Sequence, residues 1–170
     1  ADPPRAEKSK IIIGTIAHDY PTKDLNTLRE AFEIVKRELP STELKIIGRG
    51  SKFGEINNAA NLLPTFDIYV CSSIKEGFPY SILEAMAAGL PVLLPHSFAP
   101  LFGEGALYGA PADFPALIDR MRDSALRAAQ GRIAAKVAAD RFGINRHLAR
   151  LKSLDIGHRE MPAPPALPAL

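Results

Sequence analysis

Two carboxylates eight positions apart, Glu76 and Glu84, are the residues whose types and spacing first suggest chemistry in this chain. They lie in the stretch EGFPYSILEAMAAGLPVLLP, which predicts a loop, a helix, a sharp stop and a buried strand. Pro79 suits the first helical position, and Gly89 suits the left-handed position after the helix. Glu84 is therefore the one charged residue inside a helix predicted over residues 79–88.

The predicted helix has two unlike faces. Three- and four-residue spacing places one set of apolar side chains where they can face a sheet: Ile82, Leu83 and Met86. The opposite face is small or polar and consists of Tyr80, Ser81, Glu84, Ala87 and Ala88. This second face leaves room for a ligand, from which Glu84 can accept hydrogen bonds.

The amino end of this helix is a natural anion site, because its amide hydrogens and the positive end of its dipole suit a phosphate. Gly77 permits backbone conformations that other residues avoid. A carboxylate such as Glu76 is unfavourable beside a phosphate unless a polyol or a cation lies between them. A nucleotide sugar fits this arrangement, with its ribose at Glu84, its diphosphate at the helix start and its sugar near Glu76. The alternative is structural: Glu84 is then a surface residue of an ordinary helix, and Glu76 a loop residue near the helix dipole.

Short apolar runs alternate with helical patterns along the chain. Strands are expected at residues 10–14, ending at Gly14, and at 43–50, 66–73 and 90–95, with a short edge strand at 105–109. Helices are expected at residues 25–39, with Asp24 as the N-cap, and at 79–88, 113–129 and 131–152. This alternation predicts an α/β fold with a mainly parallel sheet and helices on both faces. Ligands of such sheets bind beyond the carboxyl ends of the strands.

The composition excludes several classes of function. With 170 residues, 46% hydrophobic and 24% charged, the chain is expected to form one globular domain. A net charge of +2, no Trp and 7% aromatic residues argue against a nucleic-acid partner. The lone cysteine, Cys71, is expected in the core, and the four histidines lack metal-ligand spacing, so no metal site is expected. No apolar run reaches the length of a membrane span, and a cytoplasmic location is the default expectation.

The two ends of the chain differ from its centre. Residues 1–9 are polar and contain two prolines, which predicts a linker. Residues 153–170 end in MPAPPALPAL, which predicts a disordered, proline-rich tail, with a docking peptide for a partner as the alternative. Arg141, Arg146 and Arg150 lie at helical spacing, which is typical of a solvated face and also of attraction to anionic lipid.

These stretches resemble retaining glycosyltransferases of the glycogen-synthase and sucrose-synthase type, the glycosyl transferases group 1. EGFPYSILEAMAAGLPVLLP is similar to the family signature of two glutamates with seven residues between them, Ala-Met-Ala, Gly-x-Pro and a buried strand. The resemblance continues in IIIGTIAHDYPTKDLNTLREAF, ELKIIGRG, FDIYVCSS and RIAAKVAADRFGINRHLARL, and covers residues 10–152. It implies one half of a glycosyltransferase B-type fold: a Rossmann-like domain that binds the nucleotide sugar. The other half would be an N-terminal acceptor-binding domain, in cis or as another chain, across a cleft.

The resemblance also implies roles for single residues. Glu76 would contact the transferred sugar, Lys23 would neutralise the donor diphosphate, and Glu84 would hold the ribose hydroxyls. Further donor contacts fall on Gly77, Phe78, Pro79 and Tyr80 at the helix start, on Gly14 and Thr15, and on Arg49. The family transfers its sugar with retention and needs no metal or other cofactor. Members with lipid-linked acceptors contact membranes peripherally.

The sequence departs from the family pattern in three places. Thr15 stands where members usually carry a phosphate-clamping Arg, and Arg49 or Lys75 would have to replace it. The stretch SKFGEINNAANLLPT has no counterpart of the strand–Gly segment that the family places near the nucleotide base. The acceptor domain has no match in this chain. Thr15 and the shortened middle stretch favour a rival hypothesis, a glycosyltransferase-like module that binds without catalysis, whereas Lys23, Glu76 and Glu84 favour the enzyme.

Overall fold

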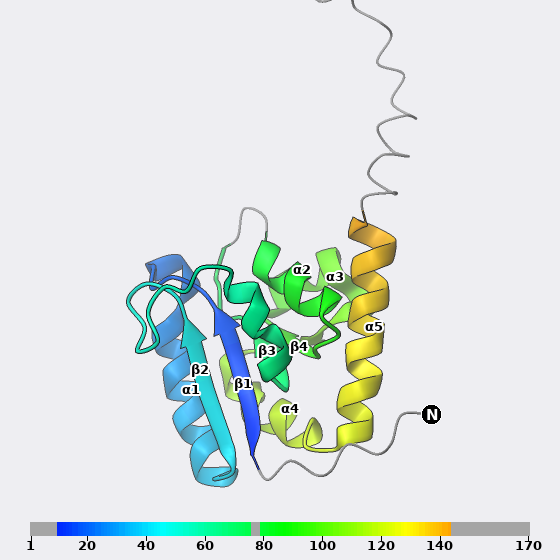
Figure 1. Ribbon diagram of the computed structural model, residues 1–170. Helices are drawn as coiled ribbons and strands as arrows, with labels where there is room; N and C mark the ends of the chain where they lie inside the picture. The colour runs from blue at the N-terminus through cyan, green and yellow to red at the C-terminus, as the bar shows by residue number, and fades with distance from the viewer. Residues whose placement is uncertain (1–9, 76–78, 144–170) are drawn as a thin grey trace, which may run out of the picture.

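The computed structural model describes residues 10–75 and 79–143, in which strands and helices alternate. Five strands form one sheet: β1 (Ile11–Ile16), β2 (Thr42–Ile47), β3 (Ile68–Val70), β4 (Val92–Leu94) and β5 (Leu107–Tyr108). All neighbours are parallel, in the order β2-β1-β3-β4-β5. The carboxyl ends of the strands therefore share one edge of the sheet, which is uppermost in Figure 1. The linker and the tail predicted at the chain ends lie outside the described residues.

Helices cover both faces of the sheet, as expected. They are α1 (Leu25–Glu38), α2 (Tyr80–Ala87), α3 (Ala99–Phe102), α4 (Phe114–Arg120) and α5 (Ser124–Phe142). Short 3₁₀ turns connect them at Pro21–Lys23, Ala59–Thr65, His96–Phe98, Gly103–Gly105 and Pro111–Asp113. Helices α1 and α4 pack against each other on one face, whereas α2 and α5 do so on the other (Figure 1). The predicted α/β class with a parallel sheet is confirmed.

Alternate residues of the central strands enter two separate cores. In β3, Ile68 and Val70 join the core beneath α1 and α4, while Tyr69 joins the core beneath α2 and α5. In β4, Leu93 faces the first core and its neighbours face the second. Burial on both faces explains why these strands read as continuous apolar runs in the sequence.

The first strand is longer than its sequence predicts. The strand was expected to end at Gly14, but β1 continues to Ile16, and Gly14 pairs with Lys45 of β2 and Tyr69 of β3. A Cβ atom at Gly14 would overlap the ring of Phe66. Gly14 therefore makes room for an aromatic side chain beneath the sheet, and it does not start a turn.

The helical region after β5 is divided differently from the prediction of helices at 113–129 and 131–152. Helix α4 ends at Arg120, and α5 runs without a break from Ser124 through Gly131 to Phe142. The carboxylate of Asp123 caps α5, accepting hydrogen bonds from the amides of Ala125 and Leu126 at 2.7 and 3.2 Å. The cap, which is an Asp within a run of charged residues, sets the boundary. The predicted extension of this helix beyond 143 lies outside the described residues.

The segment between β2 and β3 contains no strand, and every residue of it is described. Its regular part is the 3₁₀ turn Ala59–Thr65, which packs beneath α2. The sequence predicted that this stretch lacks the strand–Gly segment of the family, and this prediction is confirmed. In the described part of the chain β2 is consequently an edge strand, paired with β1 alone. Within residues 10–75 and 79–143, no helix is both long and apolar enough to cross a membrane.

Candidate functional site

The strand order reverses between β1 and β3, so the loops that follow these strands leave in different directions. Such a switch point, beyond the carboxyl ends of the strands, is where open α/β sheets bind ligands. A pocket of about 300 Å³ opens beside it, above β1 and β2. Its walls are mostly apolar, with three ionisable side chains among them, and consist of Ile16, Ala17, His18, Lys23, Ile47, Gly48, Glu55, Ile56 and Ala59. The volume is at the lower end of the range, about 300–1,000 Å³, of small-molecule sites.

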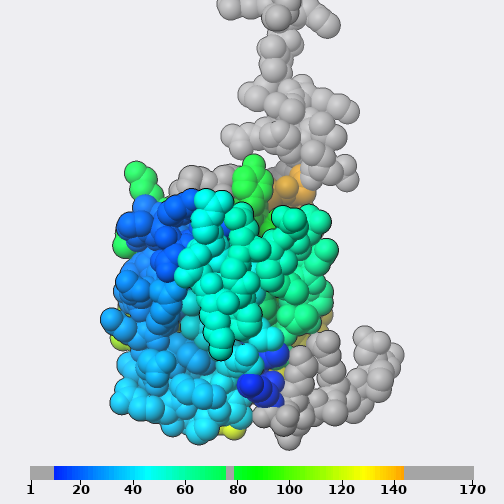
Figure 2. Space-filling model, turned by 60° about the vertical axis from the view of Figure 1, so that its left-hand side comes forward, coloured from blue at the N-terminus to red at the C-terminus, as the bar shows by residue number. Residues whose placement is uncertain are grey.

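Two loops that are distant in sequence form this pocket, which is the larger of two pockets at the switch point and is called the larger pocket. Beyond the end of β1, the amide of Ala17 donates to the carbonyl of Ile47 at 2.9 Å, and the amide of Asp19 donates to the carbonyl of Arg49 at 2.9 Å. Gly48 has φ +148°, and a Cβ atom there would overlap the Ala17 carbonyl oxygen. The glycine of the Gly-Arg-Gly turn is thus required by a close backbone approach. Figure 2 shows the cyan loop after β2 lying against the blue loop after β1.

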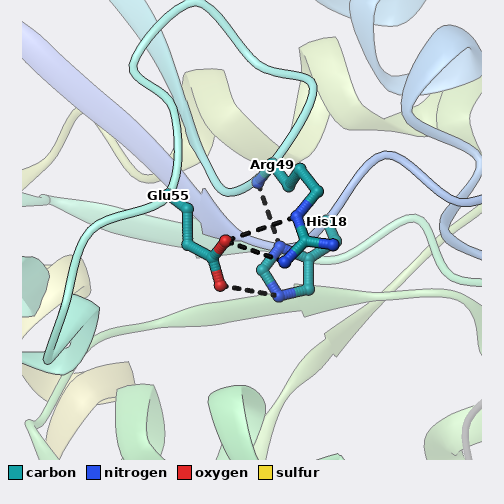
Figure 3. Close-up of polar contacts among 3 residues, drawn as sticks. All are labelled: His18, Arg49 and Glu55. Atoms are coloured by element: carbon teal, nitrogen blue, oxygen red, sulfur yellow. Dashed lines mark hydrogen bonds and ion pairs between the residues drawn. The ribbon is translucent and has the colours of Figure 1, made fainter.

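A polar network joins the two loops at the pocket. The Nδ1 atom of His18 accepts a hydrogen bond from the Arg49 amide at 3.0 Å. One carboxylate oxygen of Glu55 accepts from Nε and Nη2 of Arg49 at 3.3 and 3.1 Å, and the other lies 3.8 Å from Nε2 of His18 (Figure 3). Hydrogen bonds from its guanidinium to Glu55 raise the pKa of Arg49. The network orients the Glu55 carboxylate in the pocket wall.

A smaller pocket lies between the ends of β1 and β3 and the first turn of α2. Hydroxyl groups dominate its lining, which includes Thr15, Lys23, Tyr69, Cys71, Ser72, Ser73 and Ser81. Its volume is about 10 Å³, enough for a single water molecule. Lys23 belongs to the walls of both pockets and therefore connects the apolar pocket to the amino end of α2.

Backbone contacts fix the position of Lys23. The residue ends a 3₁₀ turn in which its amide donates to the Tyr20 carbonyl at 2.9 Å. The hydroxyl of Ser72 donates to the Lys23 carbonyl at 2.8 Å, and the amide of Ile74 donates to the Thr22 carbonyl at 2.9 Å. The loop after β1 is thereby tied to the loop after β3. The side chain of Lys23 is held at the switch point by this connection.

Asp24 occupies the cap position before α1, as predicted, but its side chain acts differently. The residue has the left-handed φ of 48°, and its carboxylate accepts from the Thr27 hydroxyl at 2.7 Å instead of from a backbone amide. This conformation turns the chain sharply from the Lys23 turn into α1.

Tyr69 closes the floor of the smaller pocket. Its hydroxyl is buried and lies 3.3 Å from the amide and 3.4 Å from the carbonyl of Ile16. Burial raises the pKa of Tyr69 well above its usual range, and hydrogen bonds with Ser81 and Thr15 oppose this rise only in part. The ring therefore remains neutral at physiological pH and fixes the end of β1 beneath the site.

Helix α2 presents its two faces as its sequence predicts. Ile82 and Met86 are buried in the core, whereas Tyr80 and Glu84 are exposed. Ser81, one turn before Glu84, lines the smaller pocket. Pro79 stands at the cap position, one residue earlier than expected, and Gly89 adopts the predicted left-handed conformation with φ +74°.

The structure brings together part of the predicted set of site residues. Lys23 and Thr15 share the smaller pocket, and Glu84, Pro79 and Tyr80 lie on the adjoining first two turns of α2. Thr15 is 2% exposed. Glu76, Gly77 and Phe78 lie outside the described residues.

Two predicted residues are placed further away. Gly14 is buried within β1, one residue below the pocket lining, where it packs against Phe66. The guanidinium of Arg49 contacts Glu55, which lines the larger pocket but not the smaller one. Lys75 is exposed after β3.

Glu55 and His18 are not among the site residues that the sequence predicts. Both line the larger pocket, but Glu55 lies in a stretch without regular structure, where no periodicity marks it. The signal that was present is the pair of glycines in Gly-Arg-Gly, which indicates a close approach of two loops. Cys71 is buried, as expected.

Comparison with known proteins assigns this architecture to a family. The family described as Glycosyl transferases group 1 matches residues 7–124. The chain belongs to this family. An uncharacterized glycosyltransferase of Haemophilus influenzae is 26% identical over 98 residues, which cover 46% of this chain and 28% of that protein. The chain thus spans a little over a quarter of the curated relative that it matches.

Solved structures of glycosyltransferases share the fold. TarM superimposes with a TM-score of 0.76 and 20% identity, covering 90% of this chain and 36% of TarM. The C-terminal domain of a Francisella tularensis glycosyl transferase group 1 family protein, LpcC, gives a TM-score of 0.65 and 20% identity, covering 79% of this chain and 87% of that domain. S. aureus TarM has also been solved with UDP. This glycosyl transferase group 1 chain therefore has the Rossmann-like fold of one half of a B-type glycosyltransferase.

Proposed function

We propose that this chain is the donor-binding half of a retaining glycosyltransferase, which binds a nucleoside diphosphate sugar at the switch point. The observation that carries the proposal is the position of Lys23 in the walls of both pockets. An apolar pocket suits a nucleoside, and a cation next to a helix amino end suits a diphosphate. The likeness to the LpcC C-terminal domain and the UDP in a TarM structure support the same reading.

The parts of the donor are assigned from the larger pocket outwards. The base occupies the larger pocket, and the ribose hydroxyls bind Glu84 on the exposed face of α2. The diphosphate, which is too large for the smaller pocket itself, lies over its mouth between Lys23 and the amino end of α2. The sugar extends towards Glu76, whose role and those of Gly77 and Phe78 remain proposals from the family signature.

The chemistry proposed for this half is stabilisation of the leaving group. As the bond from the sugar to the diphosphate breaks, negative charge grows on the phosphate oxygens. The ammonium of Lys23 and the dipole of α2 oppose that charge, as preorganised donors do at oxyanion sites. We propose that these groups act without a metal ion and that the acceptor is held by a second domain. A cytoplasmic site of action, with peripheral membrane contact, belongs to the same proposal.

A second candidate function is nucleotide binding without transfer. It is favoured by Thr15, which stands where family members usually carry an Arg and which is nearly fully buried. Losing one charged donor at a developing anion costs about 2.7–4 kcal/mol of transition-state stabilisation. Both candidates require the nucleotide site, so binding is tested first.

The binding test is calorimetry and thermal unfolding of the chain with UDP, GDP, ADP and TDP and their sugars. A nucleotide at 100 times its Kd stabilises the fold by about 2.7 kcal/mol, or about 5–10 °C in Tm. Lys23→Ala should weaken binding about 10- to 100-fold, because it removes a charge-assisted contact with the diphosphate. Lys136→Ala on the exposed face of α5 is the matched control and should bind like the unaltered chain. If no member of the panel binds, the proposed function is wrong.

A further inference from the structure

Glu55 places a carboxylate in the wall of the larger pocket, whose other lining is mostly apolar. We infer that Glu55 makes this a guanine pocket, so that the donor is a guanosine diphosphate sugar. The inference rests on the proposed function, because it names the base of the same nucleotide. It goes beyond that function by assigning a specificity-determining residue.

The hydrogen-bonding edges of the bases decide which of them a carboxylate accepts. An ionised carboxylate only accepts hydrogen bonds, and its two oxygens can take two parallel donors. Guanine presents two donors on neighbouring atoms, the N1–H and the exocyclic N2–H₂. Adenine and cytosine present a donor beside an acceptor, and uracil and thymine present one N–H between two carbonyl oxygens. Guanine is therefore the base that satisfies both oxygens without placing an acceptor against a negative charge.

The surroundings of Glu55 prepare it for this contact. Arg49 binds one oxygen through Nε and Nη2, and a carboxylate has about four lone-pair positions, so the group retains capacity for a ligand. The amide of Arg49 is in turn bonded to His18, which fixes the turn that carries the guanidinium. The positive charge of Arg49 offsets the negative charge of Glu55. This reduces repulsion between the carboxylate and the donor diphosphate at Lys23. Orientation and charge balance both favour nucleotide recognition.

The walls on either side suit a planar base. Ile16 ends β1, Ile47 ends β2, and Ile56 follows Glu55, so apolar side chains line the same pocket as the carboxylate. Stability alone does not account for the arrangement: the side chains of Arg49 and Glu55 are 69% and 51% exposed, and exposed ion pairs contribute little to folding. Recognition of a ligand would account for the Arg49–Glu55 ion pair.

The experiment measures Kd by calorimetry for GDP, IDP, UDP and ADP with the full chain and with Glu55→Gln. IDP is the sharp probe, because its base lacks only the exocyclic amino group of guanine. We expect GDP to bind about tenfold more tightly than each of the other three. Glu55→Gln replaces one acceptor with a donor, so it should weaken GDP binding about tenfold. The GDP-to-IDP ratio, which is the Kd for IDP divided by the Kd for GDP, should then be close to one. Binding of UDP should change less than threefold.

The matched control is Glu33→Gln, which removes the same charge from an exposed position of α1. It should leave all four Kd values and the GDP-to-IDP ratio unchanged. Equal or tighter binding of UDP or ADP than of GDP overturns the inference, as does a GDP-to-IDP ratio that Glu55→Gln leaves intact; either result leaves the nucleotide site standing. Failure of all four nucleotides to bind overturns the proposed function and this inference together.

Discussion

At the scale of single residues, the site depends on a few charges held by backbone contacts. Lys23 is placed by hydrogen bonds at its own amide and carbonyl, and the residue lines both pockets. Glu84 stands on the exposed face of α2, one turn after Ser81, where it meets solvent or a ligand. Substitution of these side chains should therefore change binding more than stability.

Glu84→Gln tests this separation of binding from folding. The variant keeps the shape of the side chain and removes the charge that would accept the ribose hydroxyls. We expect nucleotide affinity to fall about tenfold, the value of one charge-assisted hydrogen bond, while Tm changes little. Calorimetry and thermal unfolding measure the two effects. A large drop in Tm with unchanged affinity would mark Glu84 as a structural residue.

Tyr69 should make the stability of the protein sensitive to high pH. Burial raises its folded-state pKa, so above about pH 10 the unfolded chain loses this proton while the folded chain keeps it. The free energy of unfolding consequently decreases as the pH rises, by up to about 1.4 kcal/mol per pH unit. This contribution is fully present below pH 10 and is lost above it.

The check is urea unfolding at pH 8 and pH 11 for three proteins. Tyr69→Phe should be less stable by about 1 kcal/mol at pH 8, since it loses the contacts with Ile16, but should lose less stability between the two pH values than the unaltered chain. Tyr80→Phe alters an exposed ring and should behave like the unaltered chain. An identical pH dependence in all three proteins would rule out Tyr69 as the cause.

At the scale of elements, close contacts between helices and loops position the site. Helix α2 carries Ser81 and Glu84, and its far face packs against α5. Gly131 of α5 is a point of close approach, because a Cβ atom there would overlap the carbonyl oxygen of Gly89, just beyond the end of α2. The position of α2 therefore depends on a glycine that lies in the middle of another helix.

Gly131→Ala separates helix propensity from packing. Propensity alone predicts a gain of about 1 kcal/mol in stability. The overlap with Gly89 predicts a net loss of about 1–3 kcal/mol, because backbone atoms cannot rotate away as a side chain would. Urea unfolding gives the sign. The reverse change at an exposed position of the same helix, Ala128→Gly, should cost about 1 kcal/mol by propensity alone. Stabilisation by Gly131→Ala would show that α2 and α5 can separate freely.

At the scale of the whole molecule, the chain corresponds to one half of its structural relatives. It covers 36% of TarM but 87% of the LpcC C-terminal domain. In the proposed enzyme, a single half would leave its donor pockets open to water where a second domain would otherwise cover them. If the proposed function is right, water would screen the charge of Lys23 and compete with an acceptor for the sugar.

We therefore expect the 170-residue chain to bind nucleotide but not to transfer sugar. Holding donor and acceptor together can lower a barrier by about 7–11 kcal/mol, and a chain without an acceptor domain lacks this contribution. Adding an acceptor-binding half, in cis or as a separate chain, should restore transfer. The measurement uses a donor labelled in its sugar and a set of candidate acceptors. Robust transfer by the chain alone would show that one domain suffices.

The sequence by itself determined the family of this protein and the order of its strands and helices, but not all of their bounds. Two patterns predicted a parallel α/β fold. Strands buried on both faces give continuous apolar runs four to six residues long, whereas a helix buried on one face, such as α1, gives an apolar stripe with a period of 3.6 residues. Glu84 and Lys23 were predicted as site residues because the first is alone in an uncharged helix and the second lies in a stretch resembling the family. These signals are local, so a sequence contains them in full.

Only the tertiary structure decided which residues share a pocket. Glu55, Arg49 and His18 meet because two loops after parallel strands are joined by backbone hydrogen bonds, a pairing that no local pattern encodes. The true end of β1 was likewise hidden, since Gly14 serves the packing of Phe66, a residue 52 positions away in the chain. Contacts between residues distant in sequence depend on how the elements pack, and that packing exists only in the folded chain.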